Sequence, residues 1–294
     1  MAQISANEAG LIAGVAHDYS AEYLHQMRVG LRRLQCALKV FKDVIRLPTN
    51  LRRELNWIKA TLSTARDWDV LSGKTLVLSE SLSKSANTSA NASIHKSNSD
   101  TLPPATLSAL SDVILAATAQ AHENRKSAAM ALTSQRYTEL MLYLSLWVHG
   151  YAWRETSSAR TKRRLQITLK KNSLRKYSLS KIKALRRCLS RHCRKISAGK
   201  PRTLHKLRIA AKKARYTTEF FQSFCQKGKY LKKLVSIQET LGNNNDVIVA
   251  RRLLKQLAQA RPELRAAIKL TRAQLPDLNH PKQKHIHQLC AKLD

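Results

Sequence analysis

The chain contains 294 residues, of which 53 are Lys or Arg and only 19 are Asp or Glu, so its formal net charge is +34. Hydrophobic residues make up 43% of the sequence, which is enough for a substantial core and excludes a disordered basic tail. Because so much like charge repels itself in a folded protein, the balance favours a polyanionic partner over a neutral or cationic small molecule.

The sequence contains no run of 18 apolar residues, so we expect no membrane span. Residues 1–14 lack the basic start and apolar block of a secretory signal. The five cysteines are scattered and odd in number, which fits reduced thiols better than a disulfide framework. We therefore expect a cytoplasmic protein of one or two domains.

Helical periodicity dominates the first part of the chain. Apolar residues spaced three and four apart predict one helix over residues 19–45 and a second over about 51–78. Pro48 ends the first helix, and Thr49 is expected to cap the second. The short connection makes the two helices an antiparallel hairpin.

The middle of the chain opens with a segment rich in Ser and Asn, residues 79–101, which predicts a mobile loop. A helix then starts near Pro103 and Pro104 and continues to about Trp147, with an interruption near Thr133. Gly150 ends this stretch, and we expect two further helices between Tyr151 and Ser197.

The last part begins at a clear boundary, Gly199 to Pro201. Two helices over about 204–224 and 230–257 form another hairpin. Pro262 and Pro276 divide the remainder into short helices, and a weakly patterned tail follows.

The chain contains an internal repeat, which is its most informative feature. The segment Tyr23-Leu24-His25-Gln26-Met27-Arg28-Val29 matches Thr203-Leu204-His205-Lys206-Leu207-Arg208-Ile209 at an offset of 180 residues. The second helices match at an offset of 179, where residues 62–67 correspond to residues 241–246. Hairpin repeats over 19–78 and 203–258 thus flank a central helical region, which predicts a pseudo-symmetric all-α protein.

A polar and largely basic row follows the apolar stripe of each repeat's first helix, shifted by one position. One position is about 100° of helix rotation, so the row lies beside the core-facing stripe. The rows are His25, Arg28, Arg32, Gln35, Lys39 and Lys42 in the first repeat and His205, Arg208, Lys212, Arg215, Glu219 and Gln222 in the second. Bases at this spacing repel each other by a few tenths of a kcal/mol per pair, a cost that a bound polyanion would remove.

A charged row on a helix is usually a solvated face, but such faces normally mix acids with bases. From Arg154 to Tyr216 the chain has twenty-three Lys or Arg residues and one acid, Glu155, which favours a polyanion site. Arginine donates two bonds to one phosphate, lysine supplies a mobile charge, and histidine becomes cationic when phosphate raises its pKa. The alternative for His25 and His205 is a buried histidine bonded to a backbone carbonyl.

The two motifs, Leu24 to Arg33 and Leu204 to Tyr216, resemble the paired signatures of the CHAD family, the conserved histidine α-helical domain. Residues 65–70 and 241–246 resemble its second-helix motifs, and residues 134–137 resemble its central segment. The motifs occur in order over nearly the whole chain. The departures are Ser63, where glycine is usual, Ala214, where leucine is more usual, and the segment rich in Ser and Asn after residue 79. They concern local packing and loop structure.

This resemblance implies an all-α fold of two pseudo-symmetric helical-bundle halves, built from long antiparallel helices around a basic central pore. It also implies non-catalytic binding of inorganic polyphosphate, without cofactor or metal. The domain would extend over residues 17–275, between an N-terminal segment, 1–16, and a C-terminal tail, 276–294. We expect a cytoplasmic location, which is compatible with association with polyphosphate granules.

The residues expected to bind polyphosphate come from the two rows, their immediate neighbours and the basic central region. They are His25, Arg28, Arg32, Arg33, Lys39, His205, Arg208, Lys212, Lys213 and Arg215, together with Arg163, Lys170, Arg187 and Arg191.

The acids Asp67, Asp69 and Asp246 have two interpretations. Carboxylates beside Arg66 can hold a divalent ion, or they can anchor arginines of the basic surface through ion pairs. We favour structural ion pairs for Arg66, Asp67 and Asp246, because metal-dependent hydrolysis needs several clustered carboxylates. The sequence also lacks a P-loop and a Glu-x-Glu-x-Lys pattern.

Other functions stay open as alternatives. Net charge alone favours a nucleic-acid-binding protein, and weak nucleic-acid binding is compatible with the charge, but the sequence has no helix-turn-helix, zinc-finger or RNA-binding signature. Aromatic residues are only 5% of the chain, too few for a base-stacking surface, and the four tryptophans are expected in the core. A metal-dependent polyphosphate hydrolase is a further alternative. The tail residues His280, His285, His287 and Cys290 lack zinc-finger spacing.

Overall fold

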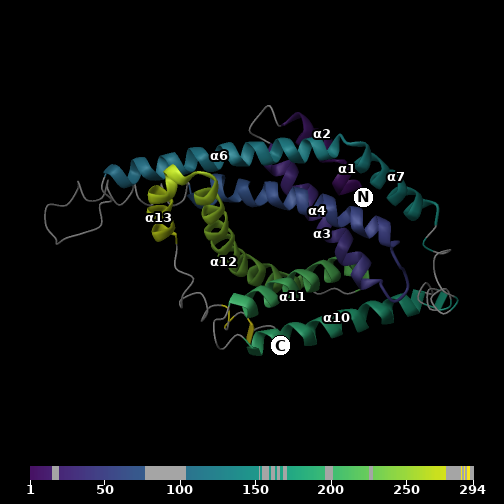
Figure 1. Ribbon diagram of the computed structural model, residues 1–294. Coiled ribbons are helices and arrows are strands. Elements are labelled where there is room, and N and C mark those ends of the chain that lie inside the picture. Colours follow the sequence, from purple (N-terminus) through teal and green to yellow (C-terminus); the bar gives the residue numbers. More distant parts are fainter. Residues whose placement is uncertain are drawn as a thin grey trace.

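The computed structural model describes residues 1–14, 20–76, 104–151, 171–195, 201–224 and 228–275, and the single positions 153, 159, 163, 166, 167, 286, 288, 290 and 291. Across these residues the chain forms helices and no β-strand, which confirms the predicted all-α class (Figure 1). No helix in this described part combines the length and the apolar character needed to cross a bilayer. The expected loop over 79–101 lies outside the described residues.

The first half of the chain contributes the upper group of helices in Figure 1, with α6 running along the top and α4 beneath it. Its elements are α1 (Ala2–Ser5), α2 (Glu8–Ala13), α3 (Ser20–Val40), α4 (Thr49–Val70), the π-helix η1 (Leu71–Leu76), α6 (Pro104–Leu132) and α7 (Gln135–His149).

The second half contributes the lower group and one link back to the upper group. Its elements are α10 (Lys171–Arg194), α11 (Pro201–Phe220), the 3₁₀ turn Gln222–Phe224, α12 (Gly228–Ala260), the 3₁₀ turn Pro262–Leu264 and α13 (Arg265–Gln274). In Figure 1, α10 and α11 lie along the bottom, and α12 rises from α11 toward α13, which packs on α6.

Two predicted boundaries in the first hairpin were wrong. The first helix ends at Val40 and not at Ile45. A bend and a turn follow at residues 41–44, and residues 45–48 are not helical. Pro48 disfavours the helical conformation at Leu47 alone. Thr49 is the first residue of α4 and not its cap. Pro48 occupies the cap position, and no side chain there bonds the free backbone N–H groups.

The predicted interruption of the central stretch is confirmed. α6 begins at Pro104 and ends at Leu132, and Ser134 caps α7 by accepting a hydrogen bond from the backbone N–H of Tyr137. Gly150 follows the last residue of α7, as expected.

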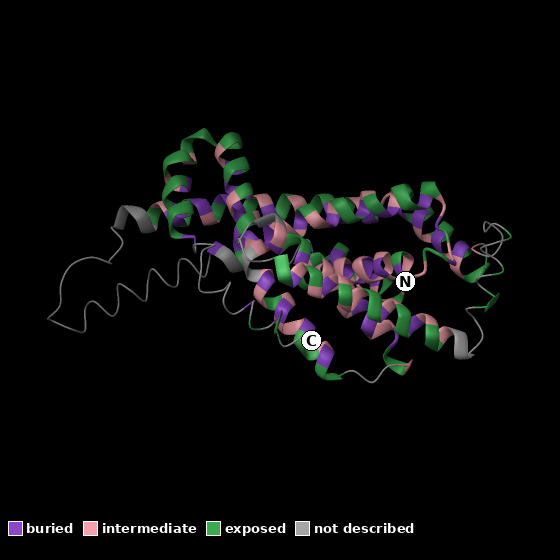
Figure 2. Ribbon diagram, turned by 90° about the horizontal axis from the view of Figure 1, so that it is seen from below, coloured by how far each residue is buried: buried purple, intermediate pink, exposed green. Residues whose placement is uncertain are grey.

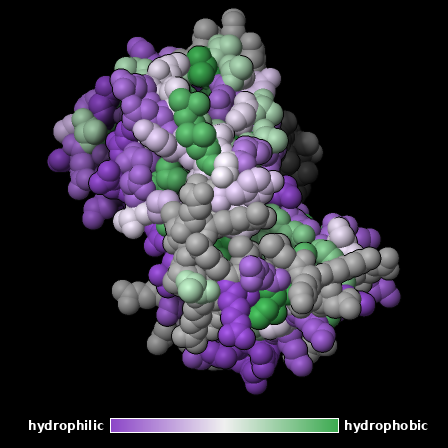
Figure 3. All heavy atoms as spheres, turned by 90° about the vertical axis from the view of Figure 1, so that its right-hand side faces the viewer, coloured by the Kyte–Doolittle hydropathy of each residue, from purple (hydrophilic) through white to green (hydrophobic). Residues whose placement is uncertain are grey.

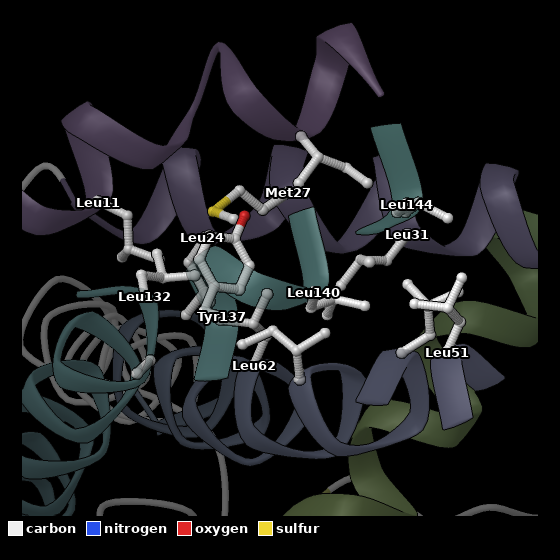
Figure 4. Close-up of a cluster of buried hydrophobic side chains, with 14 of the residues drawn as sticks. Leu11, Leu24, Met27, Leu31, Leu51, Leu62, Leu132, Tyr137, Leu140 and Leu144 are labelled. Atoms are coloured by element: carbon white, nitrogen blue, oxygen red, sulfur yellow. The ribbon is translucent and has the colours of Figure 1, made fainter. Parts of the chain in front are cut away.

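The apolar stripes of the first hairpin meet in one core cluster with α1, α2, α6 and α7 (Figure 4). Leu24, Met27, Leu62 and Leu144 in this cluster have no exposed surface. Ile4 and Leu11, from the segment expected to precede the domain, are equally buried in it. The first helices are therefore part of the core. Figure 2 shows the result, with buried residues on one side of each long helix and exposed residues on the other.

α12 belongs to two clusters at once. Its first half packs Leu234, Ile237 and Leu241 against α10 and α11. Its second half packs Leu253 and Leu254 against η1, α6 and α13. Because one continuous helix supplies both sets, the two halves of the molecule share a structural element.

Two described residues of the C-terminal tail are buried. Ile286 and Cys290 are buried in the cluster formed by α10, α11 and α12, so this part of the tail packs on the fold. His280, His285 and His287 lie outside the described residues. At the end of the molecule seen in Figure 3, the described surface is mostly hydrophilic, with an apolar strip in the upper part of the view. Leu142 and Leu146 of α7 are exposed.

Candidate anion-binding site

The first helices of the two repeats, α3 and α11, contact each other directly. The Cys36 thiol lies 3.8 Å from the backbone carbonyl of Lys213 and 3.7 Å from the hydroxyl of Thr217. One Arg32 nitrogen donates to the Tyr216 hydroxyl at 3.4 Å. The repeats are thus brought together along the helices that carry the basic rows.

A cavity of about 530 Å³ lies where α3 and α4 of the first repeat face α11 and α12 of the second. We call it the central cavity. Both basic rows contribute their first three members to its lining, and Arg66 from α4 joins them. The lining row residues are His25, Arg28, Arg32, His205, Arg208 and Lys212.

Acids share this lining. Asp67, Glu239 and Asp246 accompany the five Arg and Lys residues. Asp67 accepts hydrogen bonds from Arg28 at 3.5 Å and from Arg252 of α12 at 3.1 Å, so it ties α3, α4 and α12 together. The structural ion pair predicted for Asp67 is therefore present. Arg66 instead donates to the backbone carbonyl of Ala21 at 3.4 Å.

Arg28 and Arg208 occupy equivalent positions in the two repeats and are both held away from water. Burial lowers the pKa of Arg28 to about 10, opposed by the charge of Asp67, and the guanidinium stays protonated at neutral pH. Burial also lowers the pKa of Arg208, opposed mainly by Asp246. The buried Nε of Arg208 finds no acceptor among the described residues, and a buried donor in that state is costly.

Lys212 is the most perturbed base of the site. Burial, followed by the charges of Arg32 and Arg208, lowers its pKa from 10.5 to about 7. At neutral pH a substantial share of its side chains is thus uncharged in the empty cavity. A polyanion bound there would favour the protonated form.

The pKa of His25 is also lowered. Burial, then the charge of Arg66, lowers its pKa below the usual 6.5, so the cavity without a ligand disfavours the charged imidazole. His205 is exposed at the rim. The alternative in which each histidine is buried and bonded to a carbonyl does not describe His205.

Several predicted binding residues do not line the central cavity. Arg33 and Arg215 both pair with Glu219, at 3.9 Å and 2.8 Å. Lys213 of α11 is half-buried, and its backbone carbonyl faces Cys36. Arg163, Arg187 and Arg191 are exposed and absent from the lining, and Lys170 lies outside the described residues.

The carboxylates do not gather into a metal site. Asp69 faces away from Asp67 and pairs with Arg125 at 3.4 Å, with both side chains nearly fully buried. Among the described residues no group of three or more His, Cys, Asp or Glu side chains is placed to hold a metal ion.

Sequence reasoning missed a second basic cavity of about 810 Å³ between α3 and α4, near the connection that joins them. We call it the outer cavity. Lys39 was predicted, whereas Arg46, Arg52 and Lys59 were not. A signal for two of these existed: one position after the apolar stripe of the second helix come Arg52, Asn56, Lys59, Ser63 and Arg66.

Fold and cavity together define an all-helical protein in which two related hairpins enclose a basic, partly buried site. The family model described as the CHAD domain matches residues 1–255. The chain therefore belongs to the CHAD family, as its motifs predict.

The crystal structure of the CHAD domain from the plant Ricinus communis is similar to this structure. It shares 30% sequence identity with the chain and superposes with a TM-score of 0.74, over 99% of this chain and 88% of the other. None of the curated proteins compared with the chain matches it.

Proposed function

We propose that the protein binds inorganic polyphosphate without catalysis, through the central cavity. The observation that carries this proposal is the convergence of two repeat-related rows, each with the order His, Arg, base, on a single cavity. Two of the converging bases, Arg28 and Lys212, have pKa values lowered by burial, and a donor of Arg208 lacks an acceptor among the described residues. An anion would relieve both costs.

The shape and chemistry of the lining favour a linear phosphate chain over nucleic acid. Duplex DNA presents its phosphates on a convex surface, whereas these cations lie in a cavity between helices. Of the described residues that line the central cavity, none is Trp, Tyr or Phe, so the site offers single-stranded nucleic acid no aromatic surface for base stacking.

A titration with polyphosphate of defined lengths tests the proposal. The double variant Arg28→Gln with Arg208→Gln should weaken binding by about 100- to 10,000-fold, because each charged contact contributes about 1.5–3 kcal/mol. The matched control is Lys229→Gln with Lys232→Gln, which removes two exposed lysines of α12 and should leave the affinity within about twofold. Native affinity in the first variant would refute the assignment.

Two further measurements separate the alternative functions. If duplex DNA or RNA displaces polyphosphate at equal phosphate concentration, the proposed specificity is wrong. If Mg²⁺ supports steady release of phosphate and Asp67→Ala abolishes it, the protein is a hydrolase. We expect neither displacement nor release.

A further inference from the structure

The outer cavity is more uniformly cationic than the central cavity. Five of its lining residues carry a positive charge, namely Lys39, Lys42, Arg46, Arg52 and Lys59. The described residues of this lining include no carboxylate, whereas the central cavity has three. Such a group of like charges is unfavourable without a counter-ion.

The acids close in sequence to these bases form ion pairs with residues outside the outer cavity. Asp43 accepts from Lys181 of α10 at 2.5 Å, and Glu54 accepts from Arg136 of α7 at 2.5 Å. The neighbouring carboxylates thus hold the hairpin to α10 and α7 and do not neutralise the outer cavity.

The two cavities are lined by successive members of the same row along α3. Arg32 lines the central cavity, and the next members of the same row, Gln35 and Lys39, line the outer one. At 1.5 Å per residue, Arg32 and Lys39 are about 10 Å apart along the helix axis. Burial, then the charges of Lys39, Arg32 and Arg28, lowers the pKa of Lys59, so bases of both cavities act on one ammonium group.

Among the described residues of the second repeat, the basic positions of the outer cavity are not repeated. The offsets of 180 and 179 residues carry Lys39 onto Glu219, Lys42 onto Gln222 and Lys59 onto Gln238. Arg52 corresponds to Leu231 by the same offset. Glu219 is already paired with Arg215. Among the described residues, the lysines of the outer cavity are therefore a feature of the first repeat.

We propose that the outer cavity is a second phosphate-binding subsite, which holds the continuation of the linear phosphate chain bound in the central cavity. The chain then leaves the central cavity over the first repeat and not over the second. This inference rests on the proposed function. It adds the direction in which the phosphate chain leaves the central cavity, and it makes the affinity depend on the length of that chain.

The test compares two ligands, tripolyphosphate and long-chain polyphosphate, on a variant with Lys39→Gln, Lys42→Gln and Lys59→Gln. These lysines are exposed, so the fold should be retained. We expect the affinity for the long chain to fall on the order of 10- to 100-fold and its salt-dependence slope to fall by about 2. Tripolyphosphate, which is too short to occupy both cavities, should bind within about twofold of the native affinity.

The matched control removes the same charge from exposed lysines outside both cavities, by Lys229→Gln, Lys232→Gln and Lys269→Gln. An equal loss in this control would mean that total charge decides affinity, and the subsite would be refuted. Native affinity and slope of the first variant for the long chain would also refute it, while the proposed function would stand. If the unmodified protein binds neither ligand, the proposed function itself fails and the subsite with it.

Discussion

Lys212 is the residue at which burial and like charge act most strongly together. Its pKa is lowered in the folded state only, so the unfolded chain binds more protons between about pH 7 and the ordinary value of 10.5. The contribution of Lys212 to the free energy of unfolding therefore becomes more favourable as the pH rises through this window. Below about pH 7 the lysine is charged in both states, and the full cost of the buried charge falls on the fold.

We predict that Lys212→Met stabilises the unliganded protein at pH 7 by an amount on the order of 1–3 kcal/mol. The gain should shrink as the pH is raised toward 10, because the native lysine is then neutral in the folded state. Urea denaturation at pH 7 and pH 9.5 measures it. Lys206→Met, at an exposed position of the same helix, is the control. An equal gain at both pH values would contradict the prediction.

At the scale of single elements, the close packing of α2 against α3 requires glycine at position 10. A Cβ atom there would lie 2.5 Å from two ring atoms of Tyr23, closer than real contacts allow. The glycine thus permits the close approach that buries Leu11 in the first cluster.

We predict that Gly10→Ala destabilises the protein by about 1 kcal/mol, since the overpacking cost exceeds the gain in helix propensity. Gly242→Ala is the matched substitution, because a Cβ at that helical position meets no atom within 4 Å. It should stabilise the protein by up to about 1 kcal/mol. Chemical denaturation of both variants measures the difference, and changes of the same sign would refute the explanation.

Sequence periodicity predicted the elements well because burial itself follows the helical repeat. Leu51, Leu55, Ile58 and Leu62 are spaced three and four apart in the sequence, and all four are buried. The helix ends were predicted less well. The π-helix from Leu71 to Leu76 continues α4 without a break. It packs against α6 and α12, which are distant in the sequence, so no local pattern predicts it.

The site was predictable only in part. The repeat located the six row residues of the central cavity, since equivalent positions of two related hairpins face each other when the hairpins meet. Arg215 pairs with Glu219, one turn away on α11, and does not line that cavity. The row pattern alone did not distinguish this ion pair from a place in the cavity lining. The partners of Asp67 depend on Arg252, which lies 185 residues further along the chain.

At the scale of the whole molecule, the shared helix α12 couples the two halves. Removing side-chain volume from either end of it should weaken the same cooperative structure, because the helix cannot unfold in one cluster and stay intact in the other.

We predict that Leu207→Ala, in the cluster of α10, α11 and α12, lowers the free energy of unfolding by about 2–5 kcal/mol. All four tryptophans lie at or before Trp153, and none belongs to the cluster of Leu207, so their fluorescence reports on the other clusters. The variant should nevertheless shift the fluorescence transition and the far-ultraviolet circular dichroism transition equally. A fluorescence transition that stays at its native position would show that the halves unfold separately.

The contact of α3 with α11 has a consequence for the chemistry where the two repeats meet. In a homodimer built the same way, a residue near the axis would meet its own copy, and two identical bases would face each other. Here the equivalent positions hold Arg32 and Lys212, which both line the central cavity. Arginine keeps its proton, while lysine can release one when the cavity is empty and regain it when an anion arrives. Joining both repeats in one chain thus permits a division of labour between a permanent and an adjustable charge, which identical subunits do not allow.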